Sequence, residues 1–163
     1  MEARITRFLR RHHVLTISTI SEQGSWTAHC FYAFIPDHQA LVFTTDSETR
    51  HGREMLQNPN VSGGIMLETR VIGKIRGIQL TGRAVPCHPR ESGDLESIVT
   101  PSLTMNAPHL SATEVRTAYL KRFPFALAVK LDLWILHIDY IKMTDNQLGF
   151  GKKLEWRRED DRT

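Results

Sequence analysis

The sequence has few cysteines, and they stand in no pattern that would hold a metal ion or a redox-active disulfide. Cys30 and Cys87 are the only two in 163 residues, and their separation does not match the short Cys spacings of zinc or thioredoxin-like sites. We therefore expect two reduced thiols inside a cytoplasmic protein and no metal site.

Long apolar runs and a strong net charge are missing as well. No stretch approaches the roughly 20 apolar residues of a membrane-spanning helix, and the first residues are too charged for a secretory signal. The formal charge is only +3, with the basic residues scattered except between Arg4 and Arg11. Stacking aromatics interleaved with cations on one strand are not found around Phe31 and Tyr32. The expected partners therefore include neither a membrane nor a nucleic acid.

Internal repeats and changes of composition that would mark a second domain are also absent from the sequence. Apolar residues make up 40% of the chain and charged residues 24%, as in an ordinary globular protein. A chain of this length is large enough for one proper core, so we expect a single domain over residues 1–163.

What the sequence does contain is a series of short alternating segments typical of an antiparallel β protein. Strands are predicted at 14–20, 25–35, 40–44, 60–67, 75–85, 134–144 and 148–156. The connections between the first three are too short for parallel crossovers. Six or seven such strands with flanking helices predict a mainly β fold, a closed or split barrel.

Three details of these strands are specific enough to test. Gly63 and Gly64, inside the fourth strand, predict a bulge or a close approach of another backbone. Strict alternation in the sixth strand puts Ile138 and Tyr140 on the same face. The last strands are expected to span residues 133–157.

Helices are predicted at the start of the chain, in its middle and in an insert between the strands. The expected ranges are 2–12, 48–58, 87–99 and a helix that starts after a capping box at 111–114, the last two lying in a helical insert over 88–130. A proline-bounded loop should separate the two helices of the insert. In the helix at 48–58, Met55 and Leu56 are expected to face inward.

The helix predicted at 48–58 begins with cations, which is unusual. Arg50, His51 and Arg53 occupy its first turns, although the N-terminus of a helix favours acidic residues. One explanation is an anion, such as a phosphate, held there by backbone N–H groups, hydroxyls and an arginine. The other is that the arginines point into solvent at small cost. The local pattern supports both readings equally.

Four segments carry a resemblance to a known family. They are LVFTTDSETRHGREMLQNPNV at 41–61, RGIQLTG at 76–82, KRFPFA at 121–126 and TDNQLGFGKK at 144–153. With them the chain resembles, over essentially its whole length, the FMN-binding split-barrel superfamily of pyridoxamine 5'-phosphate oxidase-like proteins. It is similar in particular to the small YhbP-type branch.

The resemblance implies FMN as cofactor and a homodimer with two FMN sites at the interface, each built from both chains. The positions that it implies for FMN contact are His29, Thr44, Thr45, Thr49, Arg50, His51 and Gln79, with Phe150 and Lys152 reaching in from the partner subunit. His51 stands where the oxidases have a lysine, His29 where they have an arginine, and Phe34 where they have a second lysine.

The activity implied is that of a flavin-dependent oxidoreductase with a nicotinamide or small-molecule partner. The Arg-Leu-His-Asp-Arg run that recognises the pyridoxal phosphate ester in the oxidases is absent, so oxidation of pyridoxamine phosphate itself is not expected. A flavin does the redox chemistry on its own ring, and no side chain is predicted to be catalytic. The alternative is a non-enzymatic flavin- or haem-binding protein on the same barrel, with His29, His51 or His137 as candidate haem ligands.

Overall fold

The structure is a computed structural model, and it describes residues 1–87, 110–129 and 131–159. The short helix and the loop that the sequence predicts between 87 and 110 fall on residues 88–109, outside the described part. The other predicted helices and all predicted strands lie within it.

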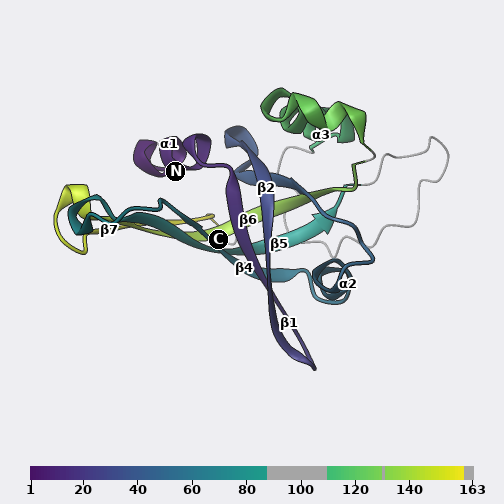
Figure 1. Ribbon diagram of the computed structural model, residues 1–163, viewed down its shortest axis with the longest axis horizontal. Coiled ribbons are helices and arrows are strands. Elements are labelled where there is room, and N and C mark those ends of the chain that lie inside the picture. Colours follow the sequence, from purple (N-terminus) through teal and green to yellow (C-terminus); the bar gives the residue numbers. More distant parts are fainter. Residues whose placement is uncertain (88–109, 130, 160–163) are drawn as a thin grey trace.

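Seven antiparallel strands form one sheet that closes on itself (Figure 1). They are β1 (Val14–Ser21), β2 (Gly24–Ile35), β3 (Ala40–Thr44), β4 (Asn60–Met66), β5 (Arg76–Pro86), β6 (Leu133–Asp145) and β7 (Lys153–Arg157). Their order is β3-β2-β1-β4-β5-β6-β7, and a further pairing of β3 with β6 completes the ring. The predicted split-barrel architecture is confirmed.

The long strand β6 is where the barrel splits. Its first part, Leu133 to His137, pairs with β3, and its later part, Tyr140 to Thr144, pairs with β7 on the same edge. Because β5 pairs with β6 along nearly its whole length on the other edge, β6 holds both halves of the sheet in one frame.

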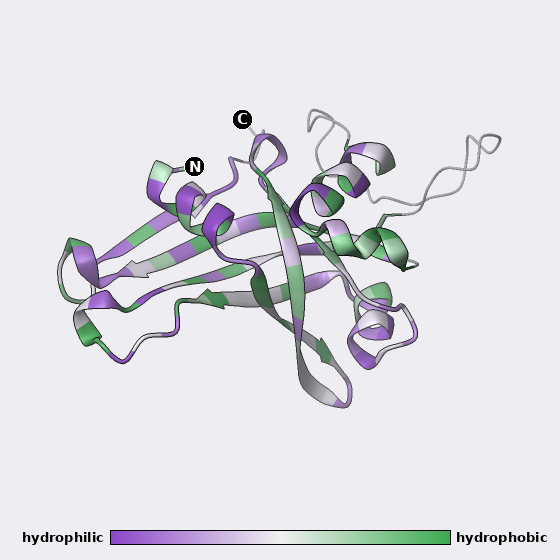
Figure 2. Cartoon of the chain, turned by 45° about the horizontal axis from the view of Figure 1, so that its top comes forward, coloured by the Kyte–Doolittle hydropathy of each residue, from purple (hydrophilic) through white to green (hydrophobic). Residues whose placement is uncertain are grey.

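The barrel interior is filled by the apolar residues of the alternating strands, and Figure 2 shows hydrophobic and hydrophilic residues alternating along them. Residues from every strand of the ring meet there, among them Leu15, Ile17, Tyr32, Phe43, Ile65, Leu80, Trp134 and Leu136. A second, smaller cluster lies outside the barrel, where Val115, Tyr119 and Phe123 cover the outer face of β2, β3 and β6.

Three α-helices flank the barrel: α1 (Ala3–Arg11), α2 (Arg50–Gln57) and α3 (Ala112–Arg122). In Figure 1, α1 and α3 lie on one side of the sheet and α2 on the other. The capping box predicted at the start of α3 is present, since Ser111 and Glu114 bond each other's backbone N–H groups. Short 3₁₀ turns join the strands at η1 (Pro36–His38), η2 (Ile72–Lys74), η3 (Pro124–Ala128) and η4 (Asn146–Leu148).

The close backbone approach predicted at the paired glycines is confirmed at Gly63. A Cβ there would lie 2.8 Å from the backbone oxygen of Thr16 on β1, which leaves no room for a side chain. Gly64 faces the other way, where the nearest atom to a Cβ would be 3.5 Å distant.

Two details of the predicted strands are wrong. The last strand starts at Lys153 rather than 148, because Gly149 and Gly151 have φ angles of 130° and 69° and extend the turn after η4. A bulge between Thr81 and Gly82 also breaks the alternation of β6. After it Ile141 is fully buried, so Tyr140 does not share the face of Ile138.

Among the described residues, no helix is long and apolar enough to cross a membrane.

The bulge gives a stability prediction at Gly82, where a Cβ would lie 2.1 Å from the backbone oxygen of His137. Gly82→Ala should lower the free energy of unfolding by about 3 kcal/mol or more, because backbone rather than a flexible side chain must move. Urea unfolding followed by circular dichroism measures this change. Gly73→Ala is the matched control, because a Cβ there meets nothing within 4 Å, and it should change stability by less than about 1 kcal/mol. Equal midpoints for the two variants would contradict the bulge geometry.

Candidate functional site

Three polar side chains converge where β3 leads into α2. The Nε2 atom of His51 lies 2.5 Å from the Thr45 hydroxyl and 3.4 Å from that of Thr49, and the two hydroxyls are 3.4 Å apart. Thr49 is the N-cap of α2, since its Oγ1 accepts a hydrogen bond from the backbone N–H of Gly52. The cluster therefore sits on the N-terminus of a helix, where unpaired N–H groups gather.

The barrel fixes the backbone of this cluster from below. The backbone N–H of Thr45 donates to the oxygen of Asp132 at 3.2 Å, and the indole N–H of Trp134 donates to the oxygen of Thr45 at 3.1 Å. The Thr44 hydroxyl donates to the same Asp132 oxygen at 3.0 Å. Because Trp134 is fully buried, Thr45 is attached to one of the most constrained points of the core.

The surroundings of His51 favour the neutral form of its imidazole. Burial lowers its pKa from the ordinary value, and the nearby carboxylate of Glu54 only partly opposes that effect. The first turn of α2 contains no acidic residue. An arriving anion would thus meet hydroxyls, an imidazole and the positive end of a helix, without a carboxylate in that turn.

Arg50 behaves in neither of the two ways that the sequence suggested. Its Nε donates to Glu54 at 2.9 Å, one helical turn along, and its guanidinium lies 4.6 Å from the ring centre of Trp26. It therefore neither reaches the hydroxyls nor extends freely into solvent.

Glu54 is the residue of this site that the sequence reading missed. It is 7% exposed and accepts hydrogen bonds from the hydroxyls of Thr19 and Ser21 as well as from Arg50. The bonds from Thr19 first, and then from Arg50, lower its pKa to about 2. Leu56, which was expected to face inward, is 54% exposed, and α2 instead turns Glu54 and Met55 toward the barrel. The sequence did carry a signal for this pair, because Glu54 stands four residues after Arg50, the spacing of an ion pair on a helix.

His29 and Gln79 do not lie at the start of α2 but on the outer face of the sheet. The register places them in one row across four strands, from His29 on β2 through Thr16 and Gly64 to Gln79 on β5. Three strand spacings separate the ends of this row, roughly 14 Å. His29 bonds the Thr16 hydroxyl at 3.0 Å, and Gly64 between them leaves the row flat.

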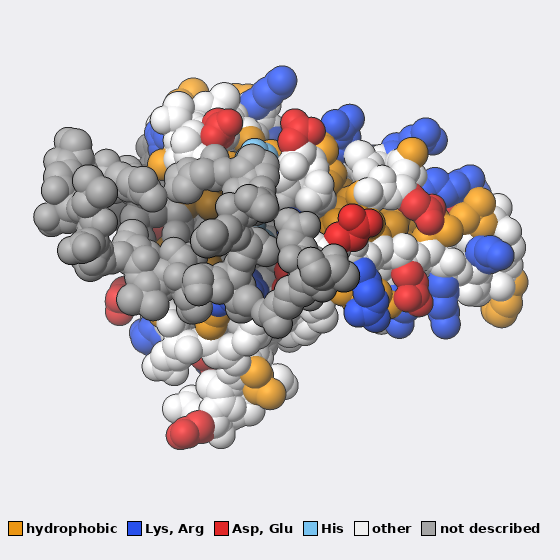
Figure 3. All heavy atoms as spheres, turned by 180° about the vertical axis from the view of Figure 1, so that it is seen from behind, with side chains coloured by type: hydrophobic (Ala, Val, Ile, Leu, Met, Phe, Trp, Pro, Cys, Tyr) orange, Lys and Arg blue, Asp and Glu red, His pale blue; other side chains and the backbone are white. Residues whose placement is uncertain are grey.

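Phe150 and Lys152 lie in the connection between β6 and β7, far from α2 (Figure 1). Phe150 is 88% exposed. At this end of the molecule Figure 3 shows hydrophobic side chains exposed between those of Lys and Arg. Within a single chain these two residues do not join the cluster at α2.

Comparison with known proteins places the chain among relatives of similar length. The pattern of the family described as pyridoxamine 5'-phosphate oxidase matches residues 1–105. A UPF0306 protein of Photorhabdus laumondii is 40% identical over 154 residues, covering 94% of each chain. A UPF0306 protein of Serratia proteamaculans is 39% identical over 157 residues, covering 96% of this chain and 95% of the other.

Three solved structures share the fold at low sequence identity. A haem-binding protein from Mycobacterium smegmatis has a TM-score of 0.65 at 17% identity, covering 96% of this chain and 59% of that one. HutZ, the haem storage protein from Vibrio cholerae, has 0.60 at 14% identity over 85% and 89% of the two chains. An FAD-binding protein from Mesorhizobium loti has 0.58 at 12% identity over 88% and 92%.

The buried carboxylate of Glu54 gives a pH prediction. Its folded pKa of about 2 lies below the ordinary 4.5, so its charge stabilises the fold above pH 4.5, and this contribution is lost as the pH falls toward 2. Glu54→Gln should therefore have a lower melting temperature than the native chain at pH 7, and the gap should narrow between pH 4.5 and 3. Circular dichroism melts at several pH values measure this. Glu48→Gln is the control, since the Glu48 side chain is 84% exposed. A gap that stays constant with pH would show that Glu54 is not held as a carboxylate.

Proposed function

We propose that this chain, which belongs to the pyridoxamine 5'-phosphate oxidase family and over nearly its whole length to the UPF0306 proteins, is an FMN-binding protein. The observation that carries the proposal is the convergence of Thr45, Thr49 and His51 on the N-terminus of α2. The Thr49 hydroxyl donates to the backbone oxygen of Asp46 at 2.7 Å, so it would have to turn from that oxygen to donate to an anion.

The phosphate of FMN suits this cluster in charge and in geometry. Two hydroxyls and the N–H groups of the first helical turn are donors, and the positive end of the helix favours the anion. Burial lowers the pKa of His51, whereas a phosphate beside it would raise that pKa. Its protonation would then add a charge-assisted bond that the free protein lacks.

Arg50 would join the site by exchanging partners. It is already tethered at the helix start, held between Glu54 and the ring of Trp26. Its side chain is 34% exposed, so it is free on one side to turn toward a bound phosphate. The hydroxyls of Thr19 and Ser21 also donate to Glu54, and these two hydrogen bonds would remain after Arg50 left the carboxylate.

The flavin, when bound, supplies the redox chemistry on its own ring system. The chain's part is to place that ring and to control access to it. The flat row from His29 to Gln79 is the surface we assign to this task, because Gly64 leaves its centre open and Gln79 offers an amide for hydrogen bonding. The activity we propose is that of an oxidoreductase with a nicotinamide or small organic partner.

Haem is the alternative ligand, because some neighbours in fold are haem-binding proteins. In this chain His29 is hydrogen-bonded to Thr16, and His51 to Thr45. Each contact uses one ring nitrogen and leaves the other for iron, so these hydrogen bonds do not exclude haem. We place the flavin first because the hydroxyls and the helix N-terminus at Thr45 and Thr49 suit a phosphate.

The experiment compares FMN with riboflavin, which lacks the phosphate. The native chain should bind FMN more tightly than riboflavin by about 1.5–3 kcal/mol, the contribution of a hydrogen bond to a charged group. Arg50→Ala should remove most of this difference by raising the Kd for FMN alone. Quenching of flavin fluorescence on titration measures both constants.

Arg53→Ala is the matched control, because Arg53 lies on the same helix with a side chain that is 60% exposed. Arg53→Ala should leave the ratio of the Kd for FMN to the Kd for riboflavin unchanged. Equal affinity of the native chain for FMN and riboflavin would refute the phosphate site. A Soret band in the purified protein would favour haem instead.

The proposed assembly is a homodimer that covers the outer face of β1, β2 and β4. Besides its small polar residues this face exposes Val14, Phe31 and Met66, which are 41%, 48% and 75% exposed. A second copy would bury them and would bring its own Phe150 and Lys152 toward the flavin site, which one chain alone does not do.

We expect sedimentation equilibrium to give twice the chain mass of 18.7 kDa, and Met66→Glu to give the single-chain mass because it places a charge in the interface. Leu56→Glu is the control, since Leu56 is exposed on α2, away from this face. A native chain that stays monomeric at all concentrations, or a Met66→Glu variant that stays dimeric, would exclude this interface.

A further inference from the structure

A hollow of about 270 Å³ lies where α1, β2 and α3 meet. Figure 1 shows α1 and α3 on the side of the sheet away from α2, so this hollow is separate from the proposed FMN phosphate site. Its lining combines three cations with three apolar residues: Arg10, Lys121, Arg122, Ala33, Phe34 and Ala118.

The sequence forms this hollow by packing two helices on the same strand without filling the space between them. α1 buries Ile5, Phe8 and Leu9 against the end of the barrel and leaves Arg10 outside. α3 buries Val115 and Tyr119 and contributes the small side chain of Ala118 to the lining. The floor is then the methyl groups and the half-buried ring of Phe34.

The cations around the hollow lack acidic partners. Four arginines of the described residues pair with carboxylates, for example Arg4 with Asp145 at 2.8 Å. Within the part of the chain that the structure describes, no ion pair engages Arg10, Lys121 or Arg122. Three cations therefore stand at this hollow without an ion pair to any described carboxylate.

The side chain of Arg122 is held in place beside the hollow by a hydrogen bond and by burial. Its Nη2 donates to the backbone oxygen of His12 at 2.7 Å, which ties α3 to the end of α1, while its Nε is buried without a partner. The Nε2 of His12 is likewise buried and unpartnered. Burial, and then the surrounding cations, lower the pKa of His12, and those cations are Arg11, Arg76, His13 and Arg122.

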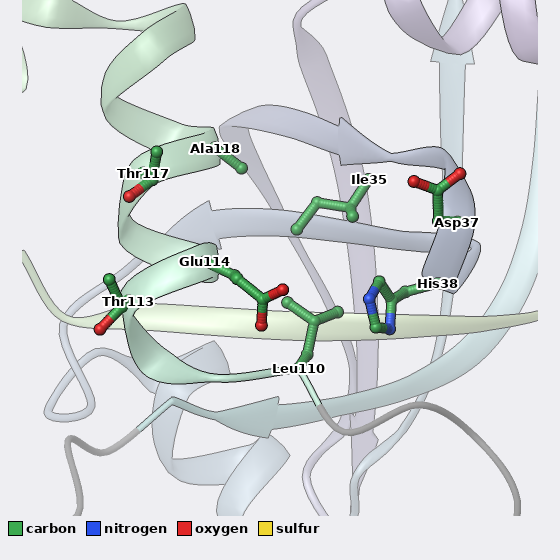
Figure 4. Close-up of a pocket in the computed structure, with 8 residues that line it drawn as sticks. All are labelled: Ile35, Asp37, His38, Leu110, Thr113, Glu114, Thr117 and Ala118. Carbon is green, nitrogen blue, oxygen red and sulfur yellow. The ribbon is translucent and has the colours of Figure 1, made fainter.

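A second hollow along the same helix has the opposite charge (Figure 4). It shares Ala118 with the first, but Asp37 and Glu114 stand at its rim, together with His38. The groove beside α3 is therefore acidic near the start of the helix and basic near its end.

We propose that the basic hollow binds a small organic anion, a carboxylate or phosphate ester with a flat or aliphatic apolar body. The anionic group contacts Lys121 and Arg10 at the rim, and the apolar body lies on Phe34 and Ala118. Cations alone would bind any anion weakly, and the floor alone would bind any apolar molecule. The combination selects a ligand that carries both.

The volume limits the size of this ligand. About 270 Å³ is slightly below the range of roughly 300–1,000 Å³ typical of ligand pockets, so one ring or a short acyl chain fits and a dinucleotide does not. A site of this size with a solvent-facing rim binds with modest affinity, as expected for a metabolite present at high concentration.

The test is a titration with phenyl phosphate followed by NMR of alanine methyl groups, because Ala33 and Ala118 line the hollow. Their signals should shift and saturate, while that of Ala84, fully buried in the barrel, stays fixed. Benzyl alcohol and inorganic phosphate, which each carry half of the ligand, should bind at least about tenfold more weakly.

Lys121→Glu and Arg10→Glu should each raise the Kd for phenyl phosphate about tenfold or more, because each removes a charge-assisted contact from an exposed position. Lys74→Glu, an exposed charge reversal in η2, is the matched control and should leave the Kd unchanged. Methyl signals that do not move, a Kd that the first two variants leave unaltered, or equal binding of inorganic phosphate would each overturn the proposal. The readout is independent of FMN, so its failure would leave the proposed FMN site untouched.

Discussion

The pairing of β3 with the first part of β6 is the constraint on which the rest of the structure depends. It closes the sheet into a ring and, by its shortness, leaves the later part of β6 to β7. It also fixes the point where the chain leaves the barrel for α2. Asp132 and Trp134, at the beginning of β6, hold the backbone of Thr45. The polar cluster at the start of α2 is therefore as rigid as the closure itself, which is what a binding site for a fixed group requires.

Glu54 explains how a helix can begin with cations and still be stable without a ligand. The carboxylate lies inside the first turns, where it takes the bond of Arg50 and of two hydroxyls from β1. It acts as an internal anion that balances the arginine. The sequence pattern suggested an external anion or solvent, and the structure contains a third solution that the spacing of Arg50 and Glu54 permits.

The sequence was a good guide to those elements whose signal is periodic. Alternation located all seven strands, and the Ser111 to Glu114 capping box located the start of α3, because both signals are local. Apart from the start of the last strand, where two local glycines extend the turn, the errors arose where a distant contact decides the outcome. The bulge at Gly82 depends on β5 meeting β6, and the burial of Glu54 depends on hydroxyls of β1 that lie 33 and 35 residues away. The resemblance named the candidate positions, but not that His29 and Gln79 lie on a different surface from Thr45 and His51.

The partner of each arginine shows whether that arginine supports the fold or is available to bind a ligand. Arg4 pairs with a carboxylate that is 1% exposed, so a ligand competing for it would have to leave a buried charge unpaired. Arg50 also pairs with a buried carboxylate, but that carboxylate keeps hydrogen bonds from two hydroxyls when Arg50 turns to a phosphate. Arg10 and Lys121 form no ion pair with any carboxylate among the residues that the structure describes. Both side chains stand at the hollow beside α3. An anion that binds there gains the attraction without breaking an existing pair, whereas at α2 it must first displace one.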